Sequence, residues 1–304
     1  MTTRRDFTFT LMSSAAGMAL APLAGCATTP TMTAMTAMTA IDCHAHVFLH
    51  SLPMPDPRRA PAGYDAAPET YLGLLDAHGM SHGVLVQPSF LGLDNRYLLS
   101  VLRAHPQRLR GIAVVAPGVS TQELDGLQEA GVVGIRLNLV GLPVPDFASP
   151  GWPELLEQVR LRDWQVEVHQ IAQELQPVLA PLLAAGVKVV VDHFGRPSAM
   201  LGVNDPGFRY LLSQAQTRRV WVKLSGAYRN GPAGRGEETA LAAMPLLLRE
   251  FGPERLMWGS DWPHTLFEKS AHYDAEFKLM ERWLPDLAQR RVVLRDTPAR
   301  LFRF

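Results

Sequence analysis

The chain carries the stretch Ile41-Asp42-Cys43-His44-Ala45-His46-Val47-Phe48, in which two histidines follow a short apolar run. Side chains at positions i and i+2 of a β-strand point to the same face, so we expect His44 and His46 to project together from a strand end. Two imidazoles on one face can share a divalent metal ion such as Zn, Fe, Ni or Cu. Two ordinary histidines at a strand end would show the same spacing, so the interpretation depends on the other strand ends.

Short β-rich runs alternate with helical stretches from this point onward. The strand candidates are residues 40–43, 83–87, 109–115, 131–139, 164–168, 187–191, 220–224 and 256–259. The helix candidates between them include residues 68–78, 95–105, 122–129, 153–161, 177–185, 208–216 and 240–251. Most of the strand candidates are continuously apolar, as expected of parallel strands that are covered on both faces.

Alternation of strand and helix implies right-handed β–α–β units and a parallel sheet. Eight such units within residues 41–304 predict a single-domain (β/α)8 TIM barrel of the α/β class, whose typical size is about 250 residues. A doubly wound open sheet is the alternative. It would need a Gly-rich phosphate loop after the first strand, and the sequence has none there.

Composition excludes several classes of partner. The chain has 304 residues, with 29 Lys and Arg against 29 Asp and Glu, so its net charge is zero and nothing favours nucleic acid. No apolar run after residue 40 is long enough to span a bilayer. The two cysteines, Cys26 and Cys43, cannot form a disulfide framework if Cys26 is acylated, as proposed next.

The N-terminus is expected to be a targeting segment. Thr3-Arg4-Arg5-Asp6-Phe7 resembles a twin-arginine export signal, and Leu23-Ala24-Gly25-Cys26 resembles a lipobox. Residues 1–26 are therefore predicted to be a signal peptide, and residues 27–40, with repeated Thr-Ala-Met, a flexible low-complexity linker. The prediction is an exported, periplasmic protein whose only membrane contact is a lipid on Cys26. A soluble cap helix with a chance arginine pair is the alternative.

Polar and ionisable residues follow nearly every predicted strand. In a TIM barrel, functional side chains gather at the C-terminal ends of the strands. The residues at those ends are His44, His46, Gln87, Ser89, Arg136, Asn138, His169, Asp192, His193, Ser225, Tyr228, Arg229, Asp261 and His264. A barrel built for stability alone would not concentrate such groups at one rim, so we predict an active site there. The Pro-rich segment 49–64 is expected to fold over its mouth.

Three motifs in this order resemble the amidohydrolase superfamily. They are His44-x-His46, Asp192-His193-Phe194-Gly195-Arg196-Pro197 and Gly259-Ser260-Asp261-Trp262-Pro263-His264. More narrowly, residues 41–304 resemble the amidohydrolase-related (amidohydrolase 2) branch that includes 2-pyrone-4,6-dicarboxylate lactonase and sugar-acid lactonases. The resemblance implies a hydrolase that opens a small carboxylated lactone with an activated water.

The resemblance also implies roles for individual residues. Asp261 would take a proton from water and return it to the leaving group, with His193 as the second catalytic residue. His44, His46, His169 and Asp261 would bind one divalent metal ion, with zinc expected, although metal-free catalysis stays open. Ester cleavage by water needs a base and a positive charge facing the developing oxyanion, and a metal ion lowers the pKa of bound water. No lysine ends the fourth or fifth strand, so no two-metal centre is expected.

Three arginines, Arg136, Arg196 and Arg229, follow predicted strands and suit a small acidic organic substrate, because guanidinium groups bind carboxylates bidentately. The resemblance adds Ser89, Arg136 and Arg229 as anion-binding positions, and Tyr228 is a further candidate for contact with the substrate. No acidic residue adjoins Arg136 or Arg229 in its own motif, so we expect both to lack carboxylate partners. Structural ion pairs at the rim are the alternative, most plainly for Arg196.

Two other functions use the same residues. A metal-dependent decarboxylase, which is a carbon–carbon lyase of the same superfamily, would keep His44, His46, His169 and Asp261. A non-catalytic periplasmic binding protein could also retain the barrel. Release of CO₂ distinguishes the decarboxylase, and saturable binding without turnover distinguishes the binding protein.

Overall fold

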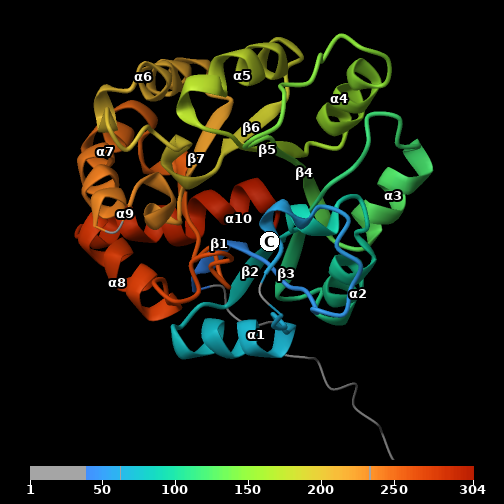
Figure 1. Ribbon diagram of the computed structural model, residues 1–304, viewed down its shortest axis with the longest axis horizontal. Coiled ribbons are helices and arrows are strands. Elements are labelled where there is room, and N and C mark those ends of the chain that lie inside the picture. The colour runs from blue at the N-terminus through green and yellow to red at the C-terminus, as the bar shows by residue number, and fades with distance from the viewer. Residues whose placement is uncertain (1–38, 62, 233) are drawn as a thin grey trace, which may run out of the picture. The chain divides into compact units, whose positions relative to one another are not determined.

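Eight strands form one parallel sheet whose hydrogen-bonding order follows the chain from β1 to β8. A computed structural model describes residues 39–61, 63–232 and 234–304, which form one compact unit (Figure 1). All eight predicted strands are present. Their bounds are β1 Ile41–Ala45, β2 His82–Val86, β3 Leu109–Ala113, β4 Val132–Asn138, β5 Gln165–His169, β6 Lys188–Val191, β7 Val220–Leu224 and β8 Leu256–Trp258.

The sheet closes between β1 and the segment that follows β8. Ala45 forms a parallel bridge with Trp262, and the backbone N–H of His46 donates to the carbonyl oxygen of Trp262 at 2.8 Å. The N–H of Asp261 donates to the carbonyl oxygen of His44, also at 2.8 Å. The predicted (β/α)8 barrel is therefore confirmed, and its closure places the first and last motifs side by side.

Ten α-helices lie in the described part of the chain, and they surround the sheet in Figure 1. Their bounds are α1 Pro68–Ala77, α2 Arg96–Ala104, α3 Thr121–Glu129, α4 Trp152–Leu161, α5 Leu175–Ala184, α6 Pro206–Ser213, α7 Arg235–Phe251, α8 Tyr273–Trp283, α9 Leu287–Arg291 and α10 Thr297–Phe302. Their inner faces pack on the sheet in the main hydrophobic cluster. A second cluster joins Ile41 and Cys43 of β1 to Phe302 of α10, so α10 covers the end of the barrel where the strands begin.

Helices α6 and α7 are among those that begin earlier than their apolar pattern predicts. Helix α6 begins at Pro206, because the carboxylate of Asp205 accepts a hydrogen bond from the N–H of Gly207 at 2.8 Å and caps the helix. Helix α7 begins at Arg235, and its first turn carries Glu237 and Glu238, whose negative charges favour a helix N-terminus without adding apolar periodicity.

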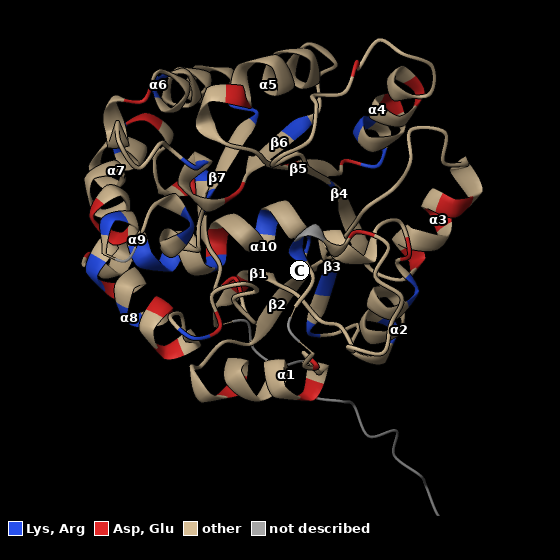
Figure 2. Ribbon diagram, viewed as in Figure 1, with Lys and Arg blue, Asp and Glu red and all other residues tan. Residues whose placement is uncertain are grey.

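Charged residues of both signs are mixed over the described part of the chain. Figure 2 shows Lys and Arg interspersed with Asp and Glu over the outer helices. No helix in the described residues is both long and apolar enough to cross a membrane. The predicted signal peptide, residues 1–26, and most of the predicted linker lie outside the described residues.

Candidate active site

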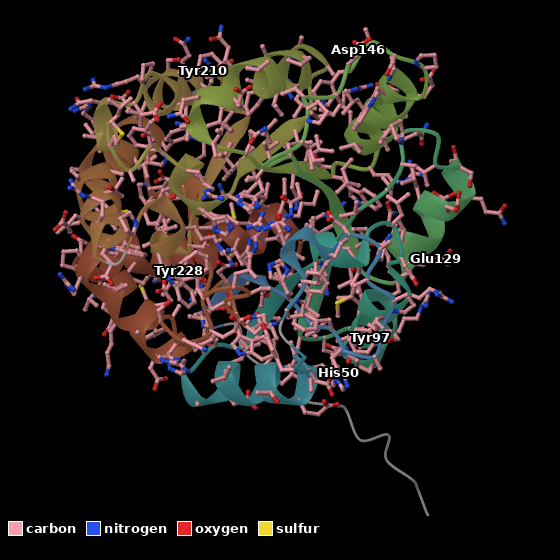
Figure 3. The ribbon with its side chains drawn as sticks, viewed as in Figure 1. His50, Tyr97, Glu129, Asp146, Tyr210 and Tyr228 are labelled. Atoms are coloured by element: carbon pink, nitrogen blue, oxygen red, sulfur yellow. The ribbon has the colours of Figure 1, made fainter. Side chains whose placement is uncertain are left out.

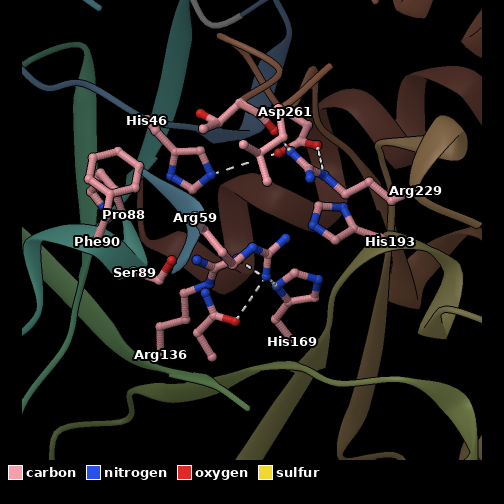
Figure 4. Close-up of a pocket in the computed structure, with 13 residues that line it drawn as sticks. His46, Arg59, Pro88, Ser89, Phe90, Arg136, His169, His193, Arg229 and Asp261 are labelled. Atoms are coloured by element: carbon pink, nitrogen blue, oxygen red, sulfur yellow. Dashed lines mark hydrogen bonds and ion pairs between the residues drawn. The ribbon is translucent and has the colours of Figure 1, made fainter. Parts of the chain in front are cut away.

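A cleft lies where the strands end, with about 350 Å³ of empty space when the part open to solvent is included. Figure 3 shows nitrogen-bearing side chains gathered at the middle of the barrel, and Figure 4 shows the cleft itself. The residues that line it are His46, Arg59, Pro88, Ser89, Phe90, Arg136, Asn138, His169, His193, Arg229, Asp261, Thr265 and Leu266. Most predicted site residues are therefore brought together. Of the others, His44 and Arg196 do not line the cleft but lie behind it, His44 next to Asp261 and Arg196 next to His169.

Asp261 has one anchored oxygen and one open oxygen. Its Oδ2 accepts hydrogen bonds from the hydroxyl of Tyr228 at 2.7 Å and from Nε of Arg229. Its Oδ1 is buried without a hydrogen-bond partner and lies 3.7 Å from Nε2 of both His44 and His46. Burial alone would raise the pKa of this carboxyl, but the Arg229 cation and nearby histidines hold the pKa well below its usual value. Asp261 is therefore a carboxylate that directs a free lone pair at the histidines.

Tyr228, which was predicted to contact the substrate, contacts Asp261. Its hydroxyl donates a hydrogen bond to Asp261 and also lies 3.1 Å from Nδ1 of His264. Tyr228 is not among the cleft-lining residues. Its hydroxyl fixes the orientation of Asp261 and does not line the cleft.

The backbone at the two predicted catalytic residues is strained. Asp261 has φ 60° and His193 has φ 53°, in the left-handed region that non-glycine residues adopt at a cost of about 1–3 kcal/mol each. Gly226 faces both of them, with φ 53°, and a Cβ added there would lie 2.7 Å from Oδ2 of Asp261 and 3.1 Å from Nδ1 of His193. Only glycine fits at this position.

His44 and His46 have different partners behind them. Nδ1 of His46 lies 2.7 Å from the carbonyl oxygen of Val86, so it carries the proton and donates, and Nε2 keeps its lone pair facing Asp261. Nδ1 of His44 lies 3.1 Å from Nζ of Lys223 and 3.4 Å from Oδ1 of Asp192, while Nε2 is buried without a partner. Burial, with the Lys223 cation second, lowers the pKa of His44 to about 3, and burial likewise lowers the pKa of His46. Both rings are neutral.

The donor set fits a divalent metal ion. Ligand atoms of His44, His46 and Asp261 lie within 4.8 Å of one another, and so do those of His44, Asp192 and His193. In the first group, Nε2 of His44 and Oδ1 of Asp261 are buried and unpartnered, so a cation between them would satisfy both. Neutral imidazole and carboxylate are ligands that zinc prefers. The carbonyl behind His46 is the kind of outer partner that fixes a ligating ring.

His169 is not brought into either group, which corrects the predicted ligand set. Among the described residues, its two ring nitrogens face arginines: Nδ1 lies 3.3 Å from Nη1 of Arg59 and 3.5 Å from Nη2 of Arg136. Nε2 lies 3.2 Å from Nη1 of Arg196. Burial, then His193 and these cations, lowers the pKa of His169 well below its usual value, so the ring is a neutral spacer among guanidinium groups.

Arg136 and Arg229 do have carboxylate partners, so the prediction that they lack them is wrong. Nη2 of Arg136 lies 3.1 Å from Oδ2 of Asp192, and Arg229 pairs with Asp261. The partners come from other strand ends, β6 and β8, which inspection of each motif alone cannot reveal. Asp192 lies among His44, Arg136 and Lys223.

Sequence reasoning missed three charged residues at or below the site. Lys223 of β7 and Glu167 of β5 form a fully buried ion pair at 2.7 Å beneath His44. Each lies two positions before a strand-end residue already chosen, Ser225 or His169, and the two-residue period of a strand points both inward. That two-residue period could have identified Lys223 and Glu167 from the sequence. Arg59 lies in the loop after β1, where no periodic pattern applies.

Known proteins match this architecture over nearly its whole length. The Amidohydrolase family model (Amidohydro_2) matches residues 41–304. A 4-sulfomuconolactone hydrolase of Rhizobium radiobacter is 33% identical over 272 residues, covering 86% of this chain and 89% of that protein. A 2-pyrone-4,6-dicarboxylate hydrolase of Comamonas testosteroni is 31% identical over 276 residues, covering 86% and 90%. The crystal structure of a probable 2-pyrone-4,6-dicarboxylic acid hydrolase from Acinetobacter baumannii, with citric acid bound, aligns with a TM-score of 0.85 at 37% identity, covering 88% of this chain and 100% of that one.

Proposed function

Because the chain belongs to the amidohydrolase family, we propose that it hydrolyses the ring ester of a small lactone that carries anionic groups. The observation that carries the proposal is the geometry of Asp261, which holds one oxygen fixed and directs the other at His44 and His46 beside an arginine-lined cleft. The relatives named for hydrolysis of a sulfonated lactone and of a pyrone dicarboxylate support the same class of substrate.

In this proposal Oδ1 of Asp261 accepts the proton of the attacking water and later returns it to the leaving alkoxide. General base assistance of this kind contributes about 10²–10⁴-fold. A carboxylate with so low a pKa is a weak base, so the water must also be made more acidic. His44, His46 and Asp261 would hold a divalent ion, with zinc expected, which when bound would lower the pKa of water and polarise the ester carbonyl.

The remaining lining groups have complementary roles. His193 is held by a 2.9 Å contact between its Nδ1 and Oγ of Ser225 and stands beside Asp261, where it can assist the second proton transfer. Arg136 and Arg229 each use only part of their donors in ion pairs, and Nε of Arg136 has no partner. Together with Ser89 they can hold the substrate's anionic groups while its carbonyl faces the histidines.

The test is ring opening by the purified full chain on a panel of carboxylated and sulfonated lactones, followed by product analysis. We expect ring opening by the natural chain and its loss in the Asp261→Asn variant. Release of CO₂ would replace the hydrolase with a decarboxylase. Saturable binding with no product would replace it with a binding protein.

We also propose that the protein is exported and anchored by a lipid on Cys26. The support is the order of Arg4-Arg5, an apolar stretch and Leu23-Ala24-Gly25-Cys26. Replacing both arginines with lysine should retain the precursor in the cytoplasm, and Cys26→Ala should release soluble protein or block processing. Unchanged localisation in both variants would contradict the proposal.

A further inference from the structure

The loop between β1 and α1 covers part of the cleft and is tied to the rim. Phe48 and Ala66 form an antiparallel bridge, with hydrogen bonds of 3.1 and 2.8 Å, that closes the loop at its base. Within the loop, the hydroxyl of Tyr64 donates to Oε1 of Glu268 at 2.9 Å, and the N–H of Asp56 donates to the carbonyl oxygen of Phe90 at 3.4 Å. These contacts hold the described part of the loop against the segments that follow β2 and β8.

Arg59 is the loop residue whose guanidinium group enters the cleft (Figure 4). Its Nη1 lies 3.4 Å from Oδ1 of Asn138 and 3.3 Å from Nδ1 of His169, which are both neutral groups. Within the described part of the chain, no carboxylate lies within ion-pair distance of it. Burial, and then the cations of three other arginines, lowers the pKa of Arg59 to about 9. Its positive charge therefore has no direct ion-pair partner among the described residues, although the charge of Asp261 acts on it from a greater distance.

Arg196, on the other side of His169, also has no ion-pair partner among the described residues. Among the described residues, the hydrogen-bond contacts of its guanidinium are to Nε2 of His169 at 3.2 Å and to the carbonyl oxygen of Arg229 at 2.9 Å, and its Nε is buried without a partner. Burial lowers the pKa of Arg196 to about 10. Two of the four guanidinium groups around the cleft are thus neutralised by aspartates, and two are not. Buried cations without counter-ions are costly, and an anion in the cleft beside Arg59 reduces that cost.

We propose that Arg59 is a specificity-determining residue, which the β1–α1 loop contributes to bind an oxyanion of the substrate, a carboxylate or a sulfonate, while the charge of Arg196 behind His169 strengthens the attraction. His169 between them is the neutral spacer that keeps the two forks apart. The proposal rests on the proposed function for the identity of the substrate, but its anion-binding part can be tested without turnover. A purely structural role, in which Arg59 only fastens the loop to Asn138 and His169, is the competing explanation.

Binding of citrate, a small polycarboxylate, to the full chain by titration calorimetry tests the site without any reaction. Arg59→Met removes the charge at similar length, and Arg59→Gln keeps a donor for Asn138 while removing the charge. Arg249→Met is the matched control, because Arg249 is exposed on α7 and pairs with its neighbour Glu250. Loss of a charge-assisted bond should weaken citrate binding by about 10–100-fold in both Arg59 variants and leave the control unchanged.

Kinetics on a matched pair of lactones, one with an anionic substituent and one uncharged, separates the two explanations. We expect the Arg59 variants to raise KM for the anionic lactone only, and Arg59→Lys to recover part of the loss. Equal losses on both lactones, or citrate binding as tight as in the natural chain, would overturn the proposal, as would failure of the natural chain to bind citrate. If the natural chain binds citrate through Arg59 but opens no lactone, the proposed function fails while the oxyanion site stands.

Discussion

Replacement of Gly226 by alanine is expected to damage catalysis out of proportion to its effect on stability. The new Cβ would lie 2.7 Å from Oδ2 of Asp261, which is about 0.7 Å inside the 3.4 Å at which ordinary contacts begin. The oxygen cannot retreat freely, because it is held by Tyr228 and Arg229. Asp261 must therefore shift or rotate by several tenths of an ångström. A misplacement of about 1 Å can reduce a rate by roughly 10²-fold, so we expect kcat to fall by about 10–100-fold with little change in KM.

The backbone contributes a separate, smaller effect. Alanine in the left-handed conformation, which Gly226 adopts with φ 53°, costs about 1–2 kcal/mol. For a domain of this size that corresponds to a fall in Tm of about 2–4 °C per kcal/mol. Gly202 provides the matched control, because its φ of 51° is similar but no atom lies within 4 Å of a Cβ added there. Gly202→Ala should thus reproduce the loss of stability without the loss of activity.

The assay compares kcat, KM and Tm of both variants with those of the natural chain, on whichever lactone the natural chain opens. If Gly226→Ala were as active as Gly202→Ala, the position of Asp261 Oδ2 would not limit the reaction, and the reasoning from this contact would be refuted. If both variants lost activity equally, strain in the backbone rather than the contact would be responsible.

Three further predictions concern the base, the metal site and a buried acid. Asp261→Asn should lower kcat by about 10²–10⁴-fold with substrate affinity retained, and a loss below roughly tenfold would transfer the role of base to another group such as His193. Elemental analysis of the full chain should find about one divalent ion per chain, and His46→Ala should lower that content; a metal-free chain that stays active in chelator would exclude the metal. Burial, then the charge of Asp261, raises the pKa of Glu276 to about 8. The protonated side chain therefore contributes to the stability of the fold below the pKa of the unfolded state, near 4.5, and this contribution is lost as pH rises through about 8. Glu276→Gln should therefore raise Tm at about pH 9 relative to the natural chain but much less at about pH 5, and equal effects at both would contradict this linkage.

Much of the site could be predicted from the sequence because of the way parallel strands are arranged. All strands of a parallel barrel end on one rim, so each residue just after a predicted strand is a candidate, however far apart such residues lie in sequence. His44, His46, His193 and Asp261 were found in this way. His44 and His46 face Oδ1 of Asp261, and the ring of His193 lies 5.0 Å from that of His44. The backbone hydrogen bond between His44 and Asp261 that closes the barrel explains why the first and last motifs share a site.

The sequence by itself determined which residues reach the rim, because the two-residue period of a strand and the apolar pattern are local properties of the chain. Only the tertiary structure decided which charges pair there. Arg136 with Asp192, and Arg229 with Asp261, are partners across different strand ends, and a separation of a few ångströms between side chains is a property of the closed barrel. The same holds for Arg59, because its loop has no period and its place in the cleft depends on contacts with Asn138 and His169, far away in the chain. Coulomb interactions and burial act through distance in space, so the charge state of the site belongs to the fold.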